Sequence, residues 1–417
     1  MTINKQRKNI LYVLSGISLE YFDVMLYVHL GAAISAALFF TDVPLMAKTG
    51  FAFSFLSTVA LRPVGALIWG HVGDKYGRKI CVTITPLIVG FSCAIMIFLP
   101  SYKEIGNYSI IAVFILRAIQ GLAWTGEKTA ANVYIVEIVE FKKAGFFSSL
   151  TGVAEGVGEV AALGLISISL FLYPENGWKY PFIIGGLVAF MSIPFRRNLE
   201  ESKEFLDAKR NQQEFNEMIF YSKNIFKNYS SILIKFLIIE TLFGAGFFFV
   251  YIYSGEVLSK ECYLTTSAVA SHNMIVSLIQ TIFIIAYGLM SIKWNGLKIV
   301  QYRVLLYIGA MPFIFGYFLT GEITEFKVYV TQIMICLLGM DHIPCLPHLM
   351  KVLPVLVRMR GFAFSYAMGK VLMYIMTTFG LTFVAQEYGK ICIPLFFIFV
   401  STCVAWAIWT YPKFKSN

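Results

Sequence analysis

The chain has 417 residues, of which 58% are hydrophobic and only 14% are charged. Soluble domains carry about 45–50% apolar and about 25% charged residues, so this composition excludes an ordinary soluble enzyme, a disordered chain and a nucleic-acid-binding domain. In a membrane protein, a net charge of +10 is normally a signal of topology. The seven cysteines show no paired spacing, which argues against a disulfide framework or a metal site.

Twelve apolar segments are candidates for membrane-spanning helices, each of which needs about 20 mostly apolar residues. The basic start of the chain resembles a signal-peptide n-region. The apolar run after it is too long, contains Glu20 and Asp23, and lacks a cleavage site, so we expect it to be retained as the first helix. The candidates are roughly 10–38, 50–72, 80–99, 109–136, 146–172, 180–195, 231–257, 266–291, 299–319, 327–350, 361–385 and 391–411.

The positions of lysine and arginine predict the orientation of these helices. With the N terminus in the cytoplasm, 24 of the 34 Lys and Arg residues fall in cytoplasmic segments and six fall in outside loops. This bias predicts a multi-pass protein of the cytoplasmic membrane with both termini inside. The polar stretch 196–230 is interpreted as a cytoplasmic linker with one amphipathic helix near 200–219. It separates an N-terminal six-helix half, 1–195, from a C-terminal one, 231–417, in an all-α membrane fold.

The end of the second helix carries the most informative motif. Residues 70–79 read Gly-His-Val-Gly-Asp-Lys-Tyr-Gly-Arg-Lys. Glycines allow close helix packing and a sharp turn, and Asp74 is available to cap a helix or to pair with an arginine. Such a contact would hold the two halves together on one side of the membrane and break on the other. A basic tight turn without a gating role is the plain alternative.

The spacing Gly-x-x-x-Asp-Lys-x-Gly-Arg-Lys resembles the signature of the loop between helices 2 and 3 in the major facilitator superfamily. The preceding Arg-Pro-x-Gly and the segments 19–27 and 117–127 are similar to its metabolite:proton symporter branch, closest in pattern to the proline/betaine transporters. Further matches lie at 177–182, 196–202 and 353–366. The branch includes carriers of proline/betaine, 2-oxoglutarate, citrate, dicarboxylates and shikimate. The resemblance implies twelve helices in two halves and secondary active transport. The gating residues it implies are Arg62, Gly70, Asp74, Gly77, Arg78, Arg358 and Arg360.

Charged side chains within the first and fourth helices predict the proton-coupling and substrate site. A charge inside a bilayer costs about 2.5–3.5 kcal/mol on insertion scales, so each such residue is a functional candidate. The spacing places Glu20, Asp23 and Tyr27 on one face of the first helix. We expect Glu20 or Asp23, with Glu127, to be proton or cation sites, and Arg117 to be their electrostatic partner. A salt-bridge cluster that only neutralises these charges is the alternative. The fourth-helix candidates are Arg117, Gln120, Trp124, Glu127 and Lys128.

Two further charged groups bear on the substrate. Lys128 disfavours a simple aromatic cage for betaine and favours a carboxylate substrate, unless an acid such as Glu155 or Glu159 of the fifth helix neutralises it. In the second half, the segment Asp341-His342-Ile343-Pro344 interrupts the tenth helix. An interrupted helix can line a binding site, although a plain proline kink explains it equally well. Lys370 of the eleventh helix could meet Asp341.

The sequence therefore predicts a solute:proton symporter that works by alternating access, with a proline- or betaine-type osmolyte as the leading substrate. The alternatives are a carboxylate symporter for 2-oxoglutarate or a dicarboxylate, a metabolite antiporter or facilitator, and a receptor that does not transport. No P-loop, metal-binding or nucleophile motif occurs, so we expect no enzymatic activity, cofactor or metal. The expected partners are the solute, the proton and the lipid bilayer, without nucleic acid. The oligomeric state is left open.

Overall fold

The computed structural model describes residues 3–38, 44–174, 177–191, 199–211, 225–339 and 342–414, and the regular structure in these ranges is entirely helical. The first half contains α1 (Ile3–Leu38), α2 (Pro44–Tyr76), α3 (Arg78–Ile97), α4 (Tyr102–Ile105), α5 (Asn107–Ile138), α6 (Phe141–Leu172) and α7 (Lys179–Met191). The short helix α9 (Lys203–Arg210) follows. The second half contains α11 (Ser230–Phe247), η1 (Phe248–Tyr253), α12 (Ser254–Lys260), α13 (Thr266–Lys293), α14 (Gly296–Leu319), α15 (Glu325–Gly339), η2 (Ile343–Cys345), α16 (Leu346–Met350), α17 (Val355–Tyr374), η3 (Ile375–Leu381), α18 (Thr382–Tyr388) and α19 (Cys392–Trp409).

The distribution of side chains is that of a membrane protein. Large apolar side chains such as Phe98, Phe171 and Phe313 are 78–81% exposed at the surface of the bundle. Carboxylates and guanidinium groups such as Glu20 and Arg62 are instead at least nine-tenths buried. Lipid is a favourable solvent for apolar side chains and a costly one for charges, so this arrangement stabilises the bundle only inside a bilayer.

Nine helical segments of the described residues are long and apolar enough to cross a membrane. They account for nine of the twelve expected spans. The expected spans at 50–72, 180–195 and 361–385 correspond to α2, the shorter apolar helix α7, and the continuous run from α17 through η3 to α18. The chain is therefore an all-helical, multi-pass membrane protein, as the sequence predicted.

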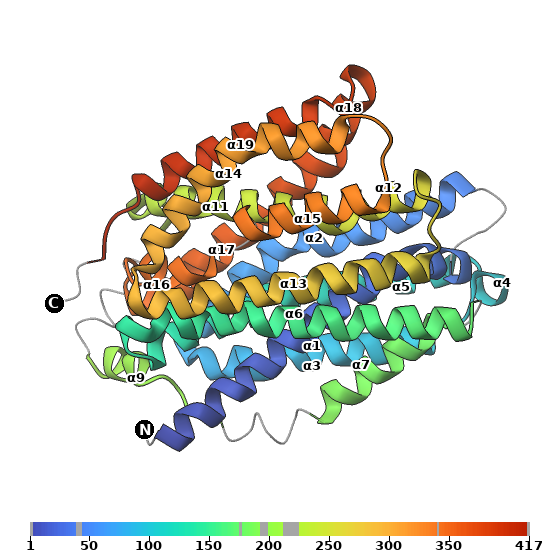
Figure 1. Ribbon diagram of the computed structural model, residues 1–417. Helices are drawn as coiled ribbons and strands as arrows, with labels where there is room; N and C mark the ends of the chain where they lie inside the picture. The colour runs from blue at the N-terminus through green and yellow to red at the C-terminus, as the bar shows by residue number, and fades with distance from the viewer. Residues whose placement is uncertain are drawn as a thin grey trace.

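Two pairs of helices make the most extensive contacts between the halves. Helix α6 packs along α13, and α2 packs along α17. Figure 1 shows α6 and α13 lying side by side over most of their length. Within the first half, α2 packs on α5, α1 on α6 and α3 on α5, while α11 on α17 and α14 on α19 hold the second half together. These contacts place the space between the halves at the centre of the bundle.

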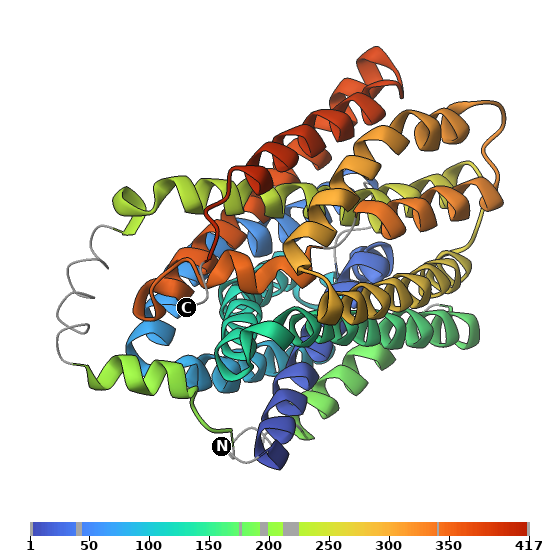
Figure 2. The same ribbon diagram turned by 60° about the vertical axis from the view of Figure 1, so that its left-hand side comes forward.

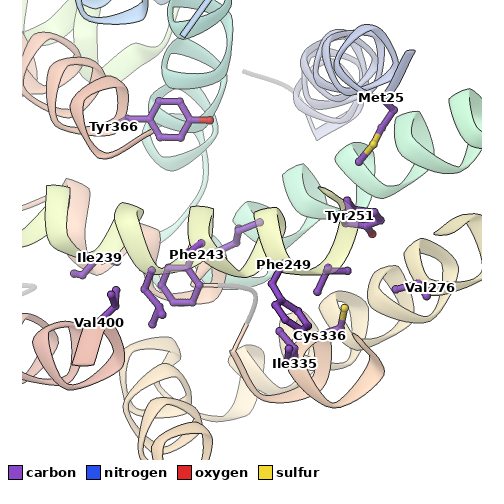
Figure 3. Close-up of a cluster of buried hydrophobic side chains, with 14 of the residues drawn as sticks. Met25, Ile239, Phe243, Phe249, Tyr251, Val276, Ile335, Cys336, Tyr366 and Val400 are labelled. Carbon is purple, nitrogen blue, oxygen red and sulfur yellow. The ribbon is translucent and has the colours of Figure 1, made fainter. Parts of the chain in front are cut away.

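A π-helical segment interrupts the seventh span and shapes the core of the second half. The span runs from α11 through η1 to α12, and η1 has the wider π-helical turn. Such bulges inside α-helices occur often at functional sites. Figure 3 shows Phe249 of η1 packed near Ile335 and Cys336 of α15, while Tyr251 of the same segment lies on another side. Phe249 and Tyr251 of this segment therefore contact different neighbours.

Helix α9 lies at the end of the bundle that also holds both chain termini, as Figures 1 and 2 show. The sequence predicted an amphipathic helix near 200–219, and the described part of that stretch is helical over Lys203–Arg210. Residues 212–224 of the expected linker, and Arg196 and Arg197, lie outside the described ranges. Ser202 caps α9 by accepting a hydrogen bond from the Phe205 N–H at 3.2 Å, as an N-cap serine typically does.

The crossing of α2 and α5 gives the first prediction. A Cβ atom at Gly121 would lie 2.2 Å from the Thr58 carbonyl oxygen, so Gly121→Ala must push the two backbones apart. We expect a loss of about 1–3 kcal/mol, as for other overpacked interiors, visible as a lower thermal midpoint of the detergent-purified chain. Gly309→Ala is the control, because a Cβ at Gly309 meets nothing within 4 Å. Equal midpoints for the two variants would contradict this packing.

Candidate functional site

A cavity of about 130 Å³ lies between the two halves of the bundle. Its first-half wall includes Tyr21, Arg62, Trp124, Lys128, Glu155 and Glu159. Its second-half wall includes Phe236, Glu240, Phe243, His342, Tyr366 and Lys370. Charged groups of both signs and aromatic rings therefore face one space, and both halves contribute them. We call this space the central cavity.

The predicted faces of the first and fourth helices do meet. Arg117 Nη1 lies 3.4 Å from Asp23 Oδ2, and the guanidinium carbon is 3.4 Å from the centre of the Tyr27 ring. Arg117 also donates a hydrogen bond to Gln120. Asp23 Oδ1 accepts a hydrogen bond from the Cys93 thiol at 2.7 Å. Asp23 and Arg117 thus neutralise each other inside the first half.

Glu20 and Glu127 lie in a smaller pocket beside this ion pair. The pocket is lined by Glu20, Asp23, Cys93 and Glu127, among others, and both glutamates are at most 2% exposed. Within the described part of the chain, neither carboxylate oxygen of Glu20 accepts a hydrogen bond. Two carboxyl groups in one pocket repel each other when both are ionised, so a proton on either one relieves the repulsion.

Lys128 and Arg62, the two first-half cations that line the central cavity, have different surroundings. Lys128 forms an ion pair with Glu155 of α6, the partner that the sequence offered together with Glu159. Arg62 stacks its guanidinium on the indole of Trp124, 3.2 Å from the ring centre. Arg62, which the resemblance placed among the gating residues, lines the central cavity.

The second half contributes its own charge cluster. Glu240 of α11 lies 2.9 Å from His342 Nε2 and 3.5 Å from Lys370 Nζ. The His342 ring stacks on Phe243, with 4.5 Å between the ring centres. Asp341, which the sequence offered as a partner of Lys370, lies outside the described residues. Glu240 is therefore the observed carboxylate partner of Lys370.

Glu159 connects the halves through hydrogen bonds. Its Oε2 accepts from Ser277 of α13 at 2.8 Å and from the Tyr251 hydroxyl of η1 at 3.2 Å. The same hydroxyl lies 2.7 Å from Gln280 Oε1. Glu159 thus reaches the opposite half, while Glu155 pairs with Lys128 within its own half.

At the terminal end of the bundle, the α2–α3 turn is joined to α17. Asp74 accepts hydrogen bonds from the backbone N–H groups of Met359 and Arg360, at 3.1 and 2.9 Å. Gly70 lies against Arg360, whose Cα would be 2.7 Å from a Cβ at position 70. Gly77 has φ 113°, a left-handed conformation that favours glycine. All of these residues were predicted to gate, and the structure brings Gly70, Asp74 and Arg360 together across the two halves.

A buried ion-pair network reinforces this contact. Glu137 Oε1 lies 2.9 Å from both Arg78 Nη2 and Arg358 Nη1, and Arg78 also donates to the Val355 carbonyl oxygen at 2.6 Å. The side chains of Glu137 and Arg78 are fully buried, and that of Arg358 is 3% exposed. We call Asp74, Arg78, Glu137 and Arg358 the gate network. It joins α2, α3 and α5 of the first half to α17 of the second.

The segment before and within α9 covers the gate network. Ser202 donates a hydrogen bond to Glu137 at 2.6 Å, and Glu204 lies 3.1 Å from Arg358 and 3.3 Å from Lys351. Glu201 accepts from the Lys79 N–H at 3.0 Å. Burial raises the pKa of the Glu201 carboxyl, although the hydrogen bonds it accepts oppose the shift. The linker after α7 thus takes part in the closed contact.

Sequence reasoning missed Glu137, Ser202 and Glu204 as partners of the predicted arginines, and Glu240 as the partner of Lys370. Glu137 stands at the end of a long apolar helix, and an acid there is a weak signal by itself. The basic residues that it faces come from segments 59 and 221 positions away. Only the folded arrangement brings these charges together.

The sequence profile of the Major Facilitator Superfamily matches residues 10–381, and the chain belongs to this family. This is a family of membrane transporters, so the expectation that the chain is not an enzyme is confirmed. The proton:xylose symporter XylE bound to 6-bromo-6-deoxy-D-glucose superposes with a TM-score of 0.81 at 15% identity, over 99% of this chain and 97% of that one. At that identity the similarity concerns the fold alone, and it confirms the predicted fold class.

Relatives in sequence match about half of the chain. A putative proline/betaine transporter of Staphylococcus aureus (strain COL) is 31% identical over 239 residues, which are 53% of this chain and 50% of that protein. The shikimate transporter of Escherichia coli K12 is 33% identical over 211 residues, 49% of this chain and 48% of that protein. The chain thus spans about half the length of the curated relatives it matches. The predicted resemblance to the metabolite:proton symporter branch is confirmed.

The gate network gives the second prediction. Glu137→Gln leaves the buried guanidinium groups of Arg78 and Arg358 facing each other without their carboxylate. Removing one partner of a buried ion pair costs about 3–5 kcal/mol, so we expect a marked fall in the thermal midpoint of the purified chain. Glu140→Gln is the matched control, since Glu140 pairs with Lys143 at an exposed site three residues later. A midpoint equal to that of the control would contradict the network.

Proposed function

We propose that the chain is a secondary active transporter that moves a small polar solute together with a proton by alternating access. The observation that carries the proposal is the central cavity. Charged and aromatic groups of both halves face it, and the gate network joins the halves at one end of the bundle. A cavity closed at one end by contacts that can break is the geometry that alternating access requires. Both halves rock about the bound solute in this mechanism.

We propose a zwitterionic osmolyte of the proline or betaine type as the solute. An unpaired Lys128 would disfavour an aromatic cage for betaine, because its positive charge repels a cation. The ion pair with Glu155 neutralises this charge. Tyr21 and Trp124 line the cavity opposite Phe243 and Tyr366, and aromatic faces attract quaternary ammonium groups. The similarity to putative proline/betaine transporters supports the same choice.

A carboxylate solute is the second candidate. The first-half wall carries Arg62 and Lys128, and a shikimate transporter is among the relatives. Symport of 2-oxoglutarate or a dicarboxylate, or exchange of metabolites, would use the same cavity. A second carboxylate on the solute would need a second free cation, and Lys128 and Lys370 are both paired with glutamates. Because both lysines are paired, the cavity favours a zwitterion with a single carboxylate.

We further propose the topology that the lysine and arginine bias predicts. The halves 1–195 and 231–417 would be joined by the linker 196–230, with both termini and α9 on the cytoplasmic side of a bacterial inner membrane. The gate network would then close the cytoplasmic end of the cavity. The bacterial origin of the relatives in sequence supports this location.

Uptake into proteoliposomes with an imposed inward proton gradient tests the function. Labelled glycine betaine, proline and 2-oxoglutarate are offered separately, with and without an uncoupler. We expect accumulation of glycine betaine or proline that the uncoupler collapses. Accumulation of 2-oxoglutarate alone would transfer the proposal to the carboxylate class. Uptake that ignores the gradient would contradict symport.

Glu127→Gln is the third prediction, and it tests the proton pathway in the same assay. The neutral amide removes the repulsion that favours a proton on Glu20, so we expect gradient-driven accumulation to be lost while membrane insertion is kept. Glu256→Gln is the control, because Glu256 pairs with Lys260 at an exposed site on α12. Unchanged accumulation by Glu127→Gln at several pH values would remove Glu127 from the mechanism.

A further inference from the structure

Most charges on the wall of the central cavity are already compensated. Within the described residues, Lys128 pairs with Glu155, Lys370 pairs with Glu240, and Glu159 accepts two hydrogen bonds. Arg62 is the cavity-lining cation that forms no ion pair in this part of the chain. It contributes to the cavity a positive charge that no ion pair within the described residues neutralises.

The surroundings of Arg62 leave its hydrogen-bonding edge available. The residue is 5% exposed, its guanidinium face lies 3.2 Å from the Trp124 ring centre, and its Nε has no hydrogen-bond partner in the described residues. Stacking uses the face of the guanidinium plane. The N–H donors at its edge have the geometry that binds a carboxylate in two places. A buried guanidinium group whose Nε donor is unsatisfied favours an anionic ligand.

Glu20 lies on the other side of Arg62. Both residues line a small pocket next to the central cavity, together with Trp124, and no ion pair joins them. Glu20 also faces Glu127 and Lys128 of α5 and Asp23 of its own helix, while Cys93 of α3 lines the neighbouring pocket. No charged side chain of α6 or α7 is among the described residues lining these two pockets. Arg62 thus stands between a buried carboxyl and the central cavity.

We infer that Arg62 binds the carboxylate group of the solute, in competition with Glu20. An ionised Glu20 attracts the guanidinium and weakens its hold on the solute. When Glu20 is protonated, it no longer attracts the guanidinium, and Arg62 can pair fully with the solute carboxylate. Proton and solute therefore promote each other's binding, as linkage requires of a symporter. The inference rests on the proposed function in that it takes the central cavity as the solute site, and it assigns carboxylate-bearing solutes as the class.

The test measures binding directly, without transport. Glycine betaine, proline and 2-oxoglutarate are added to the full chain in detergent, and their affinities are taken from the rise in thermal midpoint. Choline and pyrrolidine, which lack the carboxylate of glycine betaine and proline, are the ligand controls. We expect at least one carboxylate ligand to bind the unaltered chain. Arg62→Gln should lower the affinity for that ligand by about 10- to 150-fold, which is the effect of losing a charged hydrogen bond.

Two further variants distinguish a loss of ligand binding from misfolding. Arg62→Lys keeps the charge but loses the planar fork, so we expect folded protein with weaker carboxylate binding. Arg303→Gln is the matched control, because Arg303 is also 5% exposed and stacks on an aromatic ring, that of Tyr287, without lining the cavity. Full affinity in Arg62→Gln and Arg62→Lys, tight binding of choline or pyrrolidine, or no binding of any carboxylate ligand would overturn the inference.

A further variant tests the competition. Glu20→Gln cannot ionise, so its affinity for the carboxylate ligand should no longer fall as the pH rises, whereas that of the unaltered chain should. The same fall with pH in both proteins would remove Glu20 from the mechanism.

An uptake measurement distinguishes failure of the inference from failure of the proposed function. Binding through Arg62 without gradient-driven uptake would contradict symport alone, and uptake by Arg62→Gln at full rate would contradict the inference alone.

Discussion

The cost of a charge inside a lipid bilayer is the constraint on which the structure depends. Each unpaired charge at mid-membrane costs about 2.5–3.5 kcal/mol on insertion scales, and the bundle contains many. Most are compensated by a partner on a neighbouring helix, as Asp23 is by Arg117, Lys128 by Glu155 and Lys370 by Glu240. These pairs fix the contacts between helices. Among the described residues, Arg62 and Glu20 form no such ion pair, so both are available for binding. Arg62 lines the central cavity, and Glu20 lies in the small pocket next to it.

The same electrostatics acts differently at the terminal end of the bundle. There, Glu137 holds arginines of both halves, and Asp74 accepts backbone hydrogen bonds from α17. These contacts lie between the halves, so they must break when the halves separate. The pairs beside the cavity lie mostly within one half and can persist. Under the proposed alternating access, this division between contacts within a half and contacts across the halves would allow the two halves to move as units.

Much of the fold followed from the sequence, because the length and apolar character of a spanning segment are local properties of the chain. The motif at 70–79 also indicated the contact of Asp74 with the other half. The ion-pair partners were harder to predict. Glu137 and Arg358 are 221 positions apart, and no spacing rule relates them. Arg62 stands eight residues before Gly70 in the motif, which suggested gating, whereas the helix places it beside the cavity. One sequence without its fold cannot distinguish a paired buried charge from an unpaired one.

Proton uptake on solute binding tests the central claim most directly. Glycine betaine is added to the full chain in weakly buffered detergent solution, and the pH is recorded for the unaltered protein and for Glu20→Gln. Competition between Glu20 and the solute for Arg62 predicts that binding takes up a proton in the unaltered chain and none in Glu20→Gln. Proton release on binding, or equal uptake by both proteins, would contradict the account.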